Sequence, residues 1–282
     1  MTAAISIRGI TKRYEGRIVL DGLSFDIERG EIFAILGPNG AGKTTLVEIL
    51  EGYRERDSGE VTVIGEDPGQ PSDSASWRNK IGIVLQNASD AGDLTVREVV
   101  ENFAHYYTNP KDPSDVIKKV GLEDKHNSKV GTLSGGQRRR LDVALGMIGN
   151  PEVLFLDEPT TGFDPEARRE FWELIRSLRA EGTTILLTTH YLDEAEHLAD
   201  RVAVLAAGKV LEIATPADLG GRKSKGAWIS WSDAAGDHRE ESSSPTAFVL
   251  ALAAKSSGEI ENLQVKRPTL EDIYIDMIEA TL

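Results

Sequence analysis

Residues Gly37 to Thr44 carry the pattern that most narrows the folds open to this chain. They read Gly-Pro-Asn-Gly-Ala-Gly-Lys-Thr and match G-x-x-x-x-G-K-[ST]. Residues 31–36 before them, which are apolar from Ile32 onward, predict a short buried strand, and residues 43–51 predict a helix. Glycines let such a loop turn its N–H groups toward phosphates, and the positive end of the following helix points at the same place. The pattern therefore predicts a strand, a phosphate-binding loop and a helix.

Composition limits the classes of protein that are compatible with this loop. The net charge of -14 argues against extended, non-specific nucleic-acid binding, which depends on neutralising phosphates. The absence of cysteine excludes a disulfide framework and fits a reducing cytoplasm. The first residues lack the pattern of a signal peptide, and the apolar runs are shorter than a membrane span. We expect a soluble chain whose membrane role, if it has one, needs a partner.

The order of strand-like and helix-like segments predicts an α/β fold. Residues 153–205 alternate short apolar runs with amphipathic helices, which is typical of a mostly parallel sheet covered by helices. Residues 87–149 read as a helical block inserted between two strands of that sheet, and Thr95-Val96-Arg97-Glu98 forms a capping box within it. We predict a linker at residues 220–226, which separates a domain at 1–219 from a small α/β domain at 226–282.

Two further motifs extend the phosphate-loop prediction. Residues 133–137 read Leu-Ser-Gly-Gly-Gln, in which a serine and two glycines open a helix and so form a second anion site. Residues 153–158 form an apolar run that ends in Asp157 and Glu158, which suits a metal-holding carboxylate beside a catalytic one. Without the upstream loop, those two carboxylates would more simply be a solvated turn.

Residues 1–215 resemble the ATP-binding cassette of membrane transporters, the ABC family. The resemblance implies a P-loop NTPase fold with a mostly parallel sheet, an antiparallel β-subdomain, an inserted α-helical subdomain and a small C-terminal α/β domain. It implies Glu158, His190, Lys43 and Gln86 as catalytic residues, and Thr44, Gln86 and Asp157 as Mg²⁺ ligands. It implies ATP contacts from Tyr14, Gly37, Pro38, Asn39, Gly40, Ala41, Gly42, Lys43, Thr44, Thr45, Gln86, Ser134, Gly135, Gly136, Gln137, Asp164 and His190.

The resemblance also assigns individual roles. Tyr14 would stack on adenine, although an isolated tyrosine there would more often pack on the core. Gln86 would sense Mg²⁺ and contact the membrane subunit, and Asp164 would link two sites across a dimer. His190 would contact the γ-phosphate. In this family the Leu133–Gln137 signature binds ATP held by the opposite subunit, so the chain must pair with itself or with a similar cassette.

Three weaker resemblances concern the transporter class. Residues 137–145, 51–54 and 267–274 are similar to the ATP-binding subunits of drug-resistance exporters of the daunorubicin type. We expect an ATPase at the cytoplasmic face of the membrane that powers a separate permease, exports a drug-like or other small molecule, and binds no nucleic acid. The alternatives are an importer ATPase, a soluble cassette ATPase that acts on ribosomes or DNA, and a nucleotide-binding sensor without turnover. The cargo is not encoded in these motifs.

Overall fold

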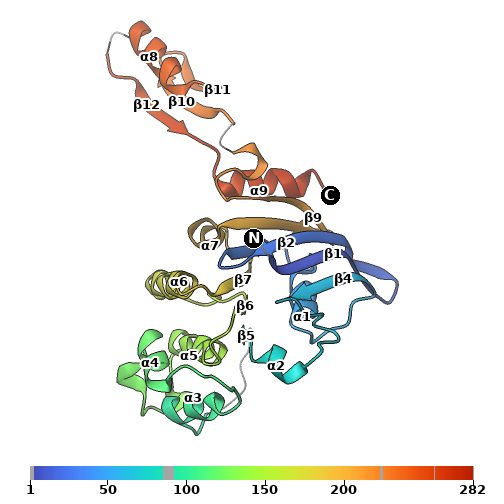
Figure 1. Cartoon of the computed structure of the whole chain (residues 1–282). Helices are drawn as coiled ribbons and strands as arrows, with labels where there is room; N and C mark the ends of the chain where they lie inside the picture. The colour runs from blue at the N-terminus through green and yellow to red at the C-terminus, as the bar shows by residue number, and fades with distance from the viewer. Residues whose placement is uncertain (1–2, 85–91, 223–224, 257, 282) are drawn as a thin grey trace. The chain divides into compact units, whose positions relative to one another are not determined.

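The computed structural model describes residues 3–84, 92–222, 225–256 and 258–281 (Figure 1). The chain divides into two compact units, one up to Ile213 and one from Ala214 onward. The second unit therefore begins a few residues before the linker predicted at 220–226.

A six-stranded sheet is the centre of the first unit. Pairing is parallel between β5 and β6, β6 and β7, β7 and β3, and β3 and β8. All residues of β3 and β7 are buried, which is why these strands read as continuous apolar runs in the sequence. The strands in sheet order are β5 (Ile81–Val84), β6 (Val153–Asp157), β7 (Thr184–Thr189), β3 (Ile32–Leu36), β8 (Arg201–Ala206) and β9 (Lys209–Ala214).

An antiparallel sheet shares its core with one face of the parallel sheet. Its order is β2 (Arg17–Glu28), β1 (Ala3–Tyr14) and β4 (Ser58–Val63). The Phe25 ring on β2 stacks on the Phe33 ring on β3, with centroids 5.5 Å apart. Helix α1 (Lys43–Leu50) buries Leu46 and Leu50 in the same core. Strands β1 and β2 pair with each other on either side of the turn at 14–17.

The helical block lies in the chain between β5 and β6, as predicted. Helices α3, α4 and α5 pack against one another (Figure 1). The capping box at Thr95 is confirmed, because the Thr95 hydroxyl accepts from the Glu98 N–H and the Glu98 carboxylate accepts from the Thr95 N–H. The described helices of the unit after α1 are α2 (Ser74–Arg78), α3 (Val96–Ala104), α4 (Pro113–Lys119), α5 (Gly135–Met147), α6 (Pro165–Ala180) and α7 (Leu192–Leu198). The 3₁₀ turns are η1 (Glu123–Lys125) and η2 (Val130–Thr132).

Two glycines allow α5 to lie directly on β5. A Cβ atom on Gly82 would stand 2.0 Å from the carbonyl oxygen of Gly146, and one on Gly146 would stand 2.6 Å from a Val84 methyl. Neither position has room for a side chain. This close approach holds the helix that begins at the Leu133–Gln137 motif against the parallel sheet.

The second unit is a small α/β domain, as predicted. Its antiparallel sheet has the order β11 (Gly236–Ser242), β10 (Ala227–Asp233), β12 (Glu261–Lys266), and α8 (Pro245–Lys255) packs on β10. The Trp231 ring is buried between the rings of His238 and Phe248, with centroids 5.0 and 5.6 Å away. Helix α9 (Leu270–Glu279) packs on η3 (Leu219–Gly221). Of the helices in the described ranges, none is both long and apolar enough to cross a membrane.

We predict that Gly82→Ala destabilises the first unit by about 1–3 kcal/mol, because the added methyl group must push α5 away from β5. Urea unfolding followed by circular dichroism measures the change. Gly258→Ala is the control, since a Cβ there meets no atom within 4 Å. Equal unfolding midpoints for Gly82→Ala and the native chain would show that the helix is not held this closely.

Candidate functional site

The candidate site is built where three neighbouring parallel strands end. Leu36 at the end of β3 pairs with Thr189 on β7, and Asp157 at the end of β6 pairs with Thr188 on β7. The three strands therefore stop at nearly the same level of the sheet. The loops that follow carry the phosphate-loop residues, the two carboxylates and His190. The fold therefore brings together groups that lie up to about 150 residues apart in sequence. They meet at the carboxyl edge of the sheet, where ligands of open α/β sheets bind.

The phosphate loop depends on backbone that other residues would not adopt. A Cβ atom on Gly37 would lie 2.2 Å from the carbonyl oxygen of Leu205. Gly40 and Gly42 have φ of 79° and 107°, and a Cβ on Gly42 would also meet the Val19 carbonyl oxygen at 2.8 Å. Among the residues that the structure describes, no side chain caps the N–H groups at the start of α1. The loop and helix end thus offer backbone donors and a positive helix end to an anion.

The Lys43 ammonium is held inside this loop. Its Nζ donates to the carbonyl oxygens of Gly37 at 2.7 Å and Pro38 at 3.3 Å. Burial lowers the pKa of Lys43, while the carboxylates of Glu158 and Asp157 act in the opposite direction. The side chain is therefore a positive charge fixed between the loop and the two carboxylates.

A pocket of about 620 Å³ joins the loop to the carboxylates. The predicted residues Tyr14, Lys43, Thr44, Asp157 and Glu158 share it. Its lining consists of Tyr14, Arg17, Val19, Asn39, Gly40, Gly42, Lys43, Thr44, Thr45, Asp157 and Glu158. Arg17 and Val19 were not predicted. They lie at the start of β2, just after Tyr14 at the end of β1, and this closeness in sequence to Tyr14 was the signal for them.

Tyr14 stands among cations at the edge of the pocket. The Lys12 Nζ lies 5.6 Å and the Arg54 guanidinium 5.4 Å from the centre of its ring. Arg54 is itself fixed by Glu48 on α1, with its Nε 2.5 Å from a carboxylate oxygen. The ring is therefore oriented by charged neighbours and is not packed away in the core.

Thr188 positions both carboxylate residues. Its hydroxyl donates to the Asp157 carboxylate at 2.5 Å and accepts from the Glu158 N–H at 3.1 Å. The Glu158 N–H also donates to the Thr188 carbonyl oxygen at 3.1 Å. Thr188 was not among the predicted site residues, because an apolar strand pattern does not show which hydroxyl at its end faces the carboxylates.

Glu158 and His190 face each other across the strand ends. The His190 Nδ1 lies 3.1 Å from a Glu158 carboxylate oxygen, and the histidine side chain is 39% exposed whereas that of the glutamate is 16% exposed. Glu158 has φ of 44°, in the left-handed region that non-glycine residues seldom adopt. Such backbone persists only where surrounding contacts fix it.

A buried carboxyl, Glu51, closes the end of α1 near Asp157. Burial raises the pKa of Glu51 to about 8, and the negative charges of Asp157 and Glu48 add to the effect. Glu51 is therefore largely neutral at pH 7. A neutral Glu51 adds no further negative charge beside Asp157.

The Leu133–Gln137 motif stands apart from this pocket. Ser134 caps α5: its hydroxyl accepts from the Gln137 N–H at 3.3 Å, and the Gln137 side chain accepts from the Ser134 N–H at 3.1 Å. Gly135 and Gly136 form the first turn of that helix. None of Ser134, Gly135, Gly136 and Gln137 lines the 620 Å³ pocket.

The remaining predicted residues are Asp164, Gln86, Pro38 and Ala41. The Asp164 carboxylate caps α6, accepting from the N–H groups of Glu166 at 3.0 Å and Ala167 at 2.8 Å. Gln86 lies outside the described residues. The roles implied for Pro38 and Ala41 rest on their place in the phosphate loop.

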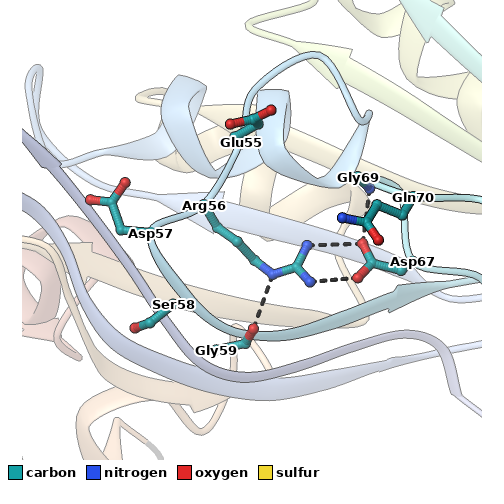
Figure 2. Close-up of a pocket in the computed structure, with 8 residues that line it drawn as sticks. All are labelled: Glu55, Arg56, Asp57, Ser58, Gly59, Asp67, Gly69 and Gln70. Carbon is teal, nitrogen blue, oxygen red and sulfur yellow. Dashed lines mark hydrogen bonds and ion pairs between the residues drawn. The ribbon is translucent and has the colours of Figure 1, made fainter.

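A second pocket, of about 370 Å³, has a structural explanation. Figure 2 shows that the Arg56 guanidinium spans to Asp67, bonding its two carboxylate oxygens at 2.9 and 2.5 Å, while its Nε donates to the Gly59 carbonyl oxygen at 3.0 Å. These groups satisfy one another and join the segment before β4 to the turn after it. None of the predicted site residues lines this pocket.

The motif helix α5 carries a partly buried ion pair. The Arg139 Nη1 lies 3.9 Å from an Asp142 carboxylate oxygen, and these side chains are 8% and 11% exposed. Burial raises the pKa of Asp142 to about 6, although the positive charges of Arg139 and Arg138 oppose the shift. Removing the carboxyl from water thus outweighs its attraction to the two arginines.

Known proteins are similar to this chain in sequence and in fold. The protein family described as ABC transporter matches residues 20–161. The Nod factor export ATP-binding protein I of Burkholderia thailandensis is 43% identical over 222 residues, which cover 77% of this chain and 72% of that protein. The protein of the same name from Rhizobium johnstonii is 45% identical over 219 residues, covering 76% and 70%.

Two solved structures have a similar fold. The cbiO1 protein from Clostridium perfringens, part of the ABC transporter complex cbiONQ, aligns with a TM-score of 0.70 at 30% identity, covering 79% of this chain and 92% of that one. An ATP-binding cassette in a dimeric, post-hydrolysis state bound to ADP and Pi aligns with a TM-score of 0.68 at 26% identity, covering 75% and 98%.

The raised pKa of Asp142 predicts a pH-dependent effect on stability. The folded chain binds this proton more tightly than the unfolded chain, where the pKa is near 3.8, so the free energy of unfolding falls as pH rises from about 4 to about 6. Asp142→Asn removes that loss. Its stability relative to the native chain should increase by about 1–2 kcal/mol between pH 4 and pH 7.

Urea unfolding at both pH values measures the difference. Asp93→Asn is the control because the Asp93 side chain is fully exposed. A relative stability of Asp142→Asn that is the same at pH 4 and pH 7 would contradict the assigned cause.

Proposed function

This chain belongs to the ABC transporter family as an ATP-binding subunit that hydrolyses ATP to drive transport, and we propose that two cassettes enclose ATP between them to power an exporter. Subunits of this family work with a membrane permease. In the proposal, ATP closes two cassettes on each other and hydrolysis releases them. That cycle moves the permease between its inward- and outward-facing states.

The separation of two anion-binding helix ends within one chain carries the dimer proposal. The pocket with Lys43 and Glu158 contains none of the residues Ser134–Gln137, although each place lies at the N-terminal end of a helix. A second copy, or a similar cassette, supplies the missing side of each pocket with Ser134, Gly135 and Gly136. The related cassette that is dimeric with ADP and Pi supports this arrangement.

We assign phosphate binding to the loop after β3. The loop N–H groups and the Lys43 ammonium bind the β- and γ-phosphates, and Tyr14 stacks on the adenine. The fixed position of Lys43 against Gly37 and Pro38 supports this role, because the charge is already oriented before nucleotide arrives. Asp164 connects the two pockets of the dimer while it caps α6.

Mg²⁺ suits the oxygen atoms at the same pocket. Thr44 and Asp157 both line it and offer hydroxyl and carboxylate oxygens, which this hard cation prefers. The described residues contain no group of three or more histidine, cysteine or acidic side chains arranged to hold a metal. Gln86 is the third proposed ligand. Bound there, Mg²⁺ supplies positive charge against the charge that develops on the transferred phosphoryl group.

Glu158 is the proposed general base. Its backbone is fixed by Thr188, and its carboxylate lies against His190 at the mouth of the pocket. In this position the carboxylate orients and polarises the attacking water, which contributes about 10²- to 10⁴-fold to the rate. His190 holds Glu158 on one side and reaches the γ-phosphate on the other.

The proposal also covers the direction of transport, the location of the chain and the parts of it that contact the permease. The curated relatives named above are called Nod factor export proteins, and we extend export, but not that cargo, to this chain. The chain sits at the cytoplasmic face of the membrane, where the Gln86 loop and helices α3–α5 contact the permease. It acts without nucleic acid. The domain at 226–282 is accessory.

We predict that Glu158→Gln abolishes turnover and keeps nucleotide binding. Phosphate release should fall by at least about 100-fold because the amide does not accept a proton from water. ATP should convert the variant into a stable dimer, measured by gel filtration with light scattering. Glu173→Gln, whose side chain is 72% exposed, is the control and should behave like the native protein. Normal hydrolysis by Glu158→Gln would refute the base assignment, and a monomer with ATP would refute the dimer.

The exporter proposal predicts that a permease accompanies the tagged chain when it is purified from its host in mild detergent. Mass spectrometry should identify an integral-membrane protein that is absent from an untagged strain. Recovery of ribosomes or DNA-bound proteins without a permease would contradict the transport role and leave the ATPase chemistry intact.

A further inference from the structure

Arg139 is a buried cation of the motif helix α5 to which the proposed function assigns no role. It lies five residues after Ser134, or about 7 Å along the helix axis, and 7% of the residue is exposed. Its neighbour Arg140 is more exposed, with 22% of its side chain accessible, and pairs with Glu170 on α6. Burying a guanidinium is costly unless its donors are satisfied, so its partners identify its role.

The Arg139 guanidinium holds the carbonyl groups on both sides of Glu158. Its Nε donates to the Pro159 carbonyl oxygen at 2.9 Å, and its Nη2 donates to the Asp157 carbonyl oxygen at 2.8 Å. A guanidinium presents its donors in a rigid plane, so the two bonds fix both carbonyl groups relative to each other. A lysine in this position has a single nitrogen on a flexible stem.

The backbone between those carbonyl groups is the one that needs support. Glu158 has φ of 44°, and its N–H donates to the Thr188 carbonyl oxygen. A glutamate keeps such a conformation only where its surroundings over-determine it. Arg139 on α5 and Thr188 on β7 are two residues that bond this turn.

The charge of Arg139 is balanced by acidic neighbours. Burial lowers its pKa, and the carboxylates of Asp142, Asp157 and Glu194 oppose that shift, with Asp142 the largest contributor. A variant that removes the guanidinium alone would therefore leave the buried Asp142 carboxyl without its cation. This effect must be separated from any effect on Glu158.

We propose that Arg139 is a positioning residue that fixes the backbone of Glu158, in its own copy of the chain, to the helix that begins at Ser134. The inference rests on the proposed function, in which Glu158 is the base and Ser134 serves the opposite pocket. Each cassette then contains one rigid link between the helix that contacts one nucleotide and the turn that hydrolyses the other. Arg139 itself touches neither nucleotide.

Steady-state hydrolysis by three variants tests the link. Arg139→Met/Asp142→Asn removes both bonds, keeps the length of the side chain and leaves no stranded carboxylate. Its kcat should fall by about 10- to 100-fold, because small displacements of a reacting group have effects of this size, while KM changes by less than about threefold. Arg139→Lys should recover part of the loss. Arg140→Met, on the next residue of the same helix, should match the native rate.

Binding is measured separately from hydrolysis. With Glu158→Gln added, Arg139→Met/Asp142→Asn should still form the ATP-dependent dimer seen for Glu158→Gln alone. A native kcat in the folded double variant would overturn the proposal. So would equal losses of ATP-dependent dimerisation and kcat, because they would assign Arg139 to binding. Should the double variant fail to fold, Arg139→Lys decides the matter: a native kcat would refute the need for the two bonds.

Mixed dimers of differently tagged copies distinguish the base from the motif helix. When Arg139→Met/Asp142→Asn is in one copy and Glu158→Gln in the other, the only working base lacks its support, and hydrolysis should be slow. When all three substitutions are in one copy, the working base belongs to the native copy, and hydrolysis should proceed at the rate of a dimer with one Glu158→Gln copy. The opposite pattern would show that Arg139 acts through Ser134 and would overturn the inference. A native protein that neither hydrolyses ATP nor dimerises would instead refute the proposed function.

Discussion

The parallel pairing of β6, β7 and β3 is the constraint on which the site depends. Because these strands are level at their carboxyl ends, the loops after them meet, and residues from three distant parts of the chain share one edge. The strands are buried on both faces, so their register is held by the apolar core of Phe33, Phe155 and Leu186. A shift of β6 by one residue along β7 would place a neighbour of Asp157 opposite Thr188, and Asp157 would lose its contact with the Thr188 hydroxyl. The chemistry of the site is thus an outcome of strand register.

Two charges buried near this edge have polar partners. Lys43 stands between loop carbonyls and two carboxylates, and Arg139 donates to two carbonyl oxygens. Glu51 has negative neighbours instead, and its pKa is raised to about 8. Buried charges without partners are strongly unfavourable, so the sequence has to supply the partners together with the charges. The result is a preorganised pocket: Lys43, Asp157 and Glu158 are already oriented by protein groups, which limits the reorganisation needed when nucleotide binds.

Much of the fold could be predicted from local patterns. The capping box at Thr95 specified one helix start, and it is present. Two strands were missed. β11 reads Gly-Asp-His-Arg-Glu-Glu-Ser, with no apolar residue on either face, and it is a strand because it pairs with β10. β9 follows β8 through a turn at Ala207 and Gly208 and continues the sheet edge. In both cases tertiary pairing outweighed weak local preference.

The sequence by itself determined the parts of the site that are short and contiguous. Glycines at Gly37 and Gly42 and the cation at Lys43 follow from backbone and phosphate chemistry within eight residues, so a linear pattern reveals them. Tertiary structure decided how the parts support one another. Thr188 reaches Asp157 from 31 residues away, and Arg139 reaches Pro159 from 20. Hydrogen bonds of this kind have no signature in the sequence, because the strand and the helix that carry these side chains are brought together only by burial of the shared core.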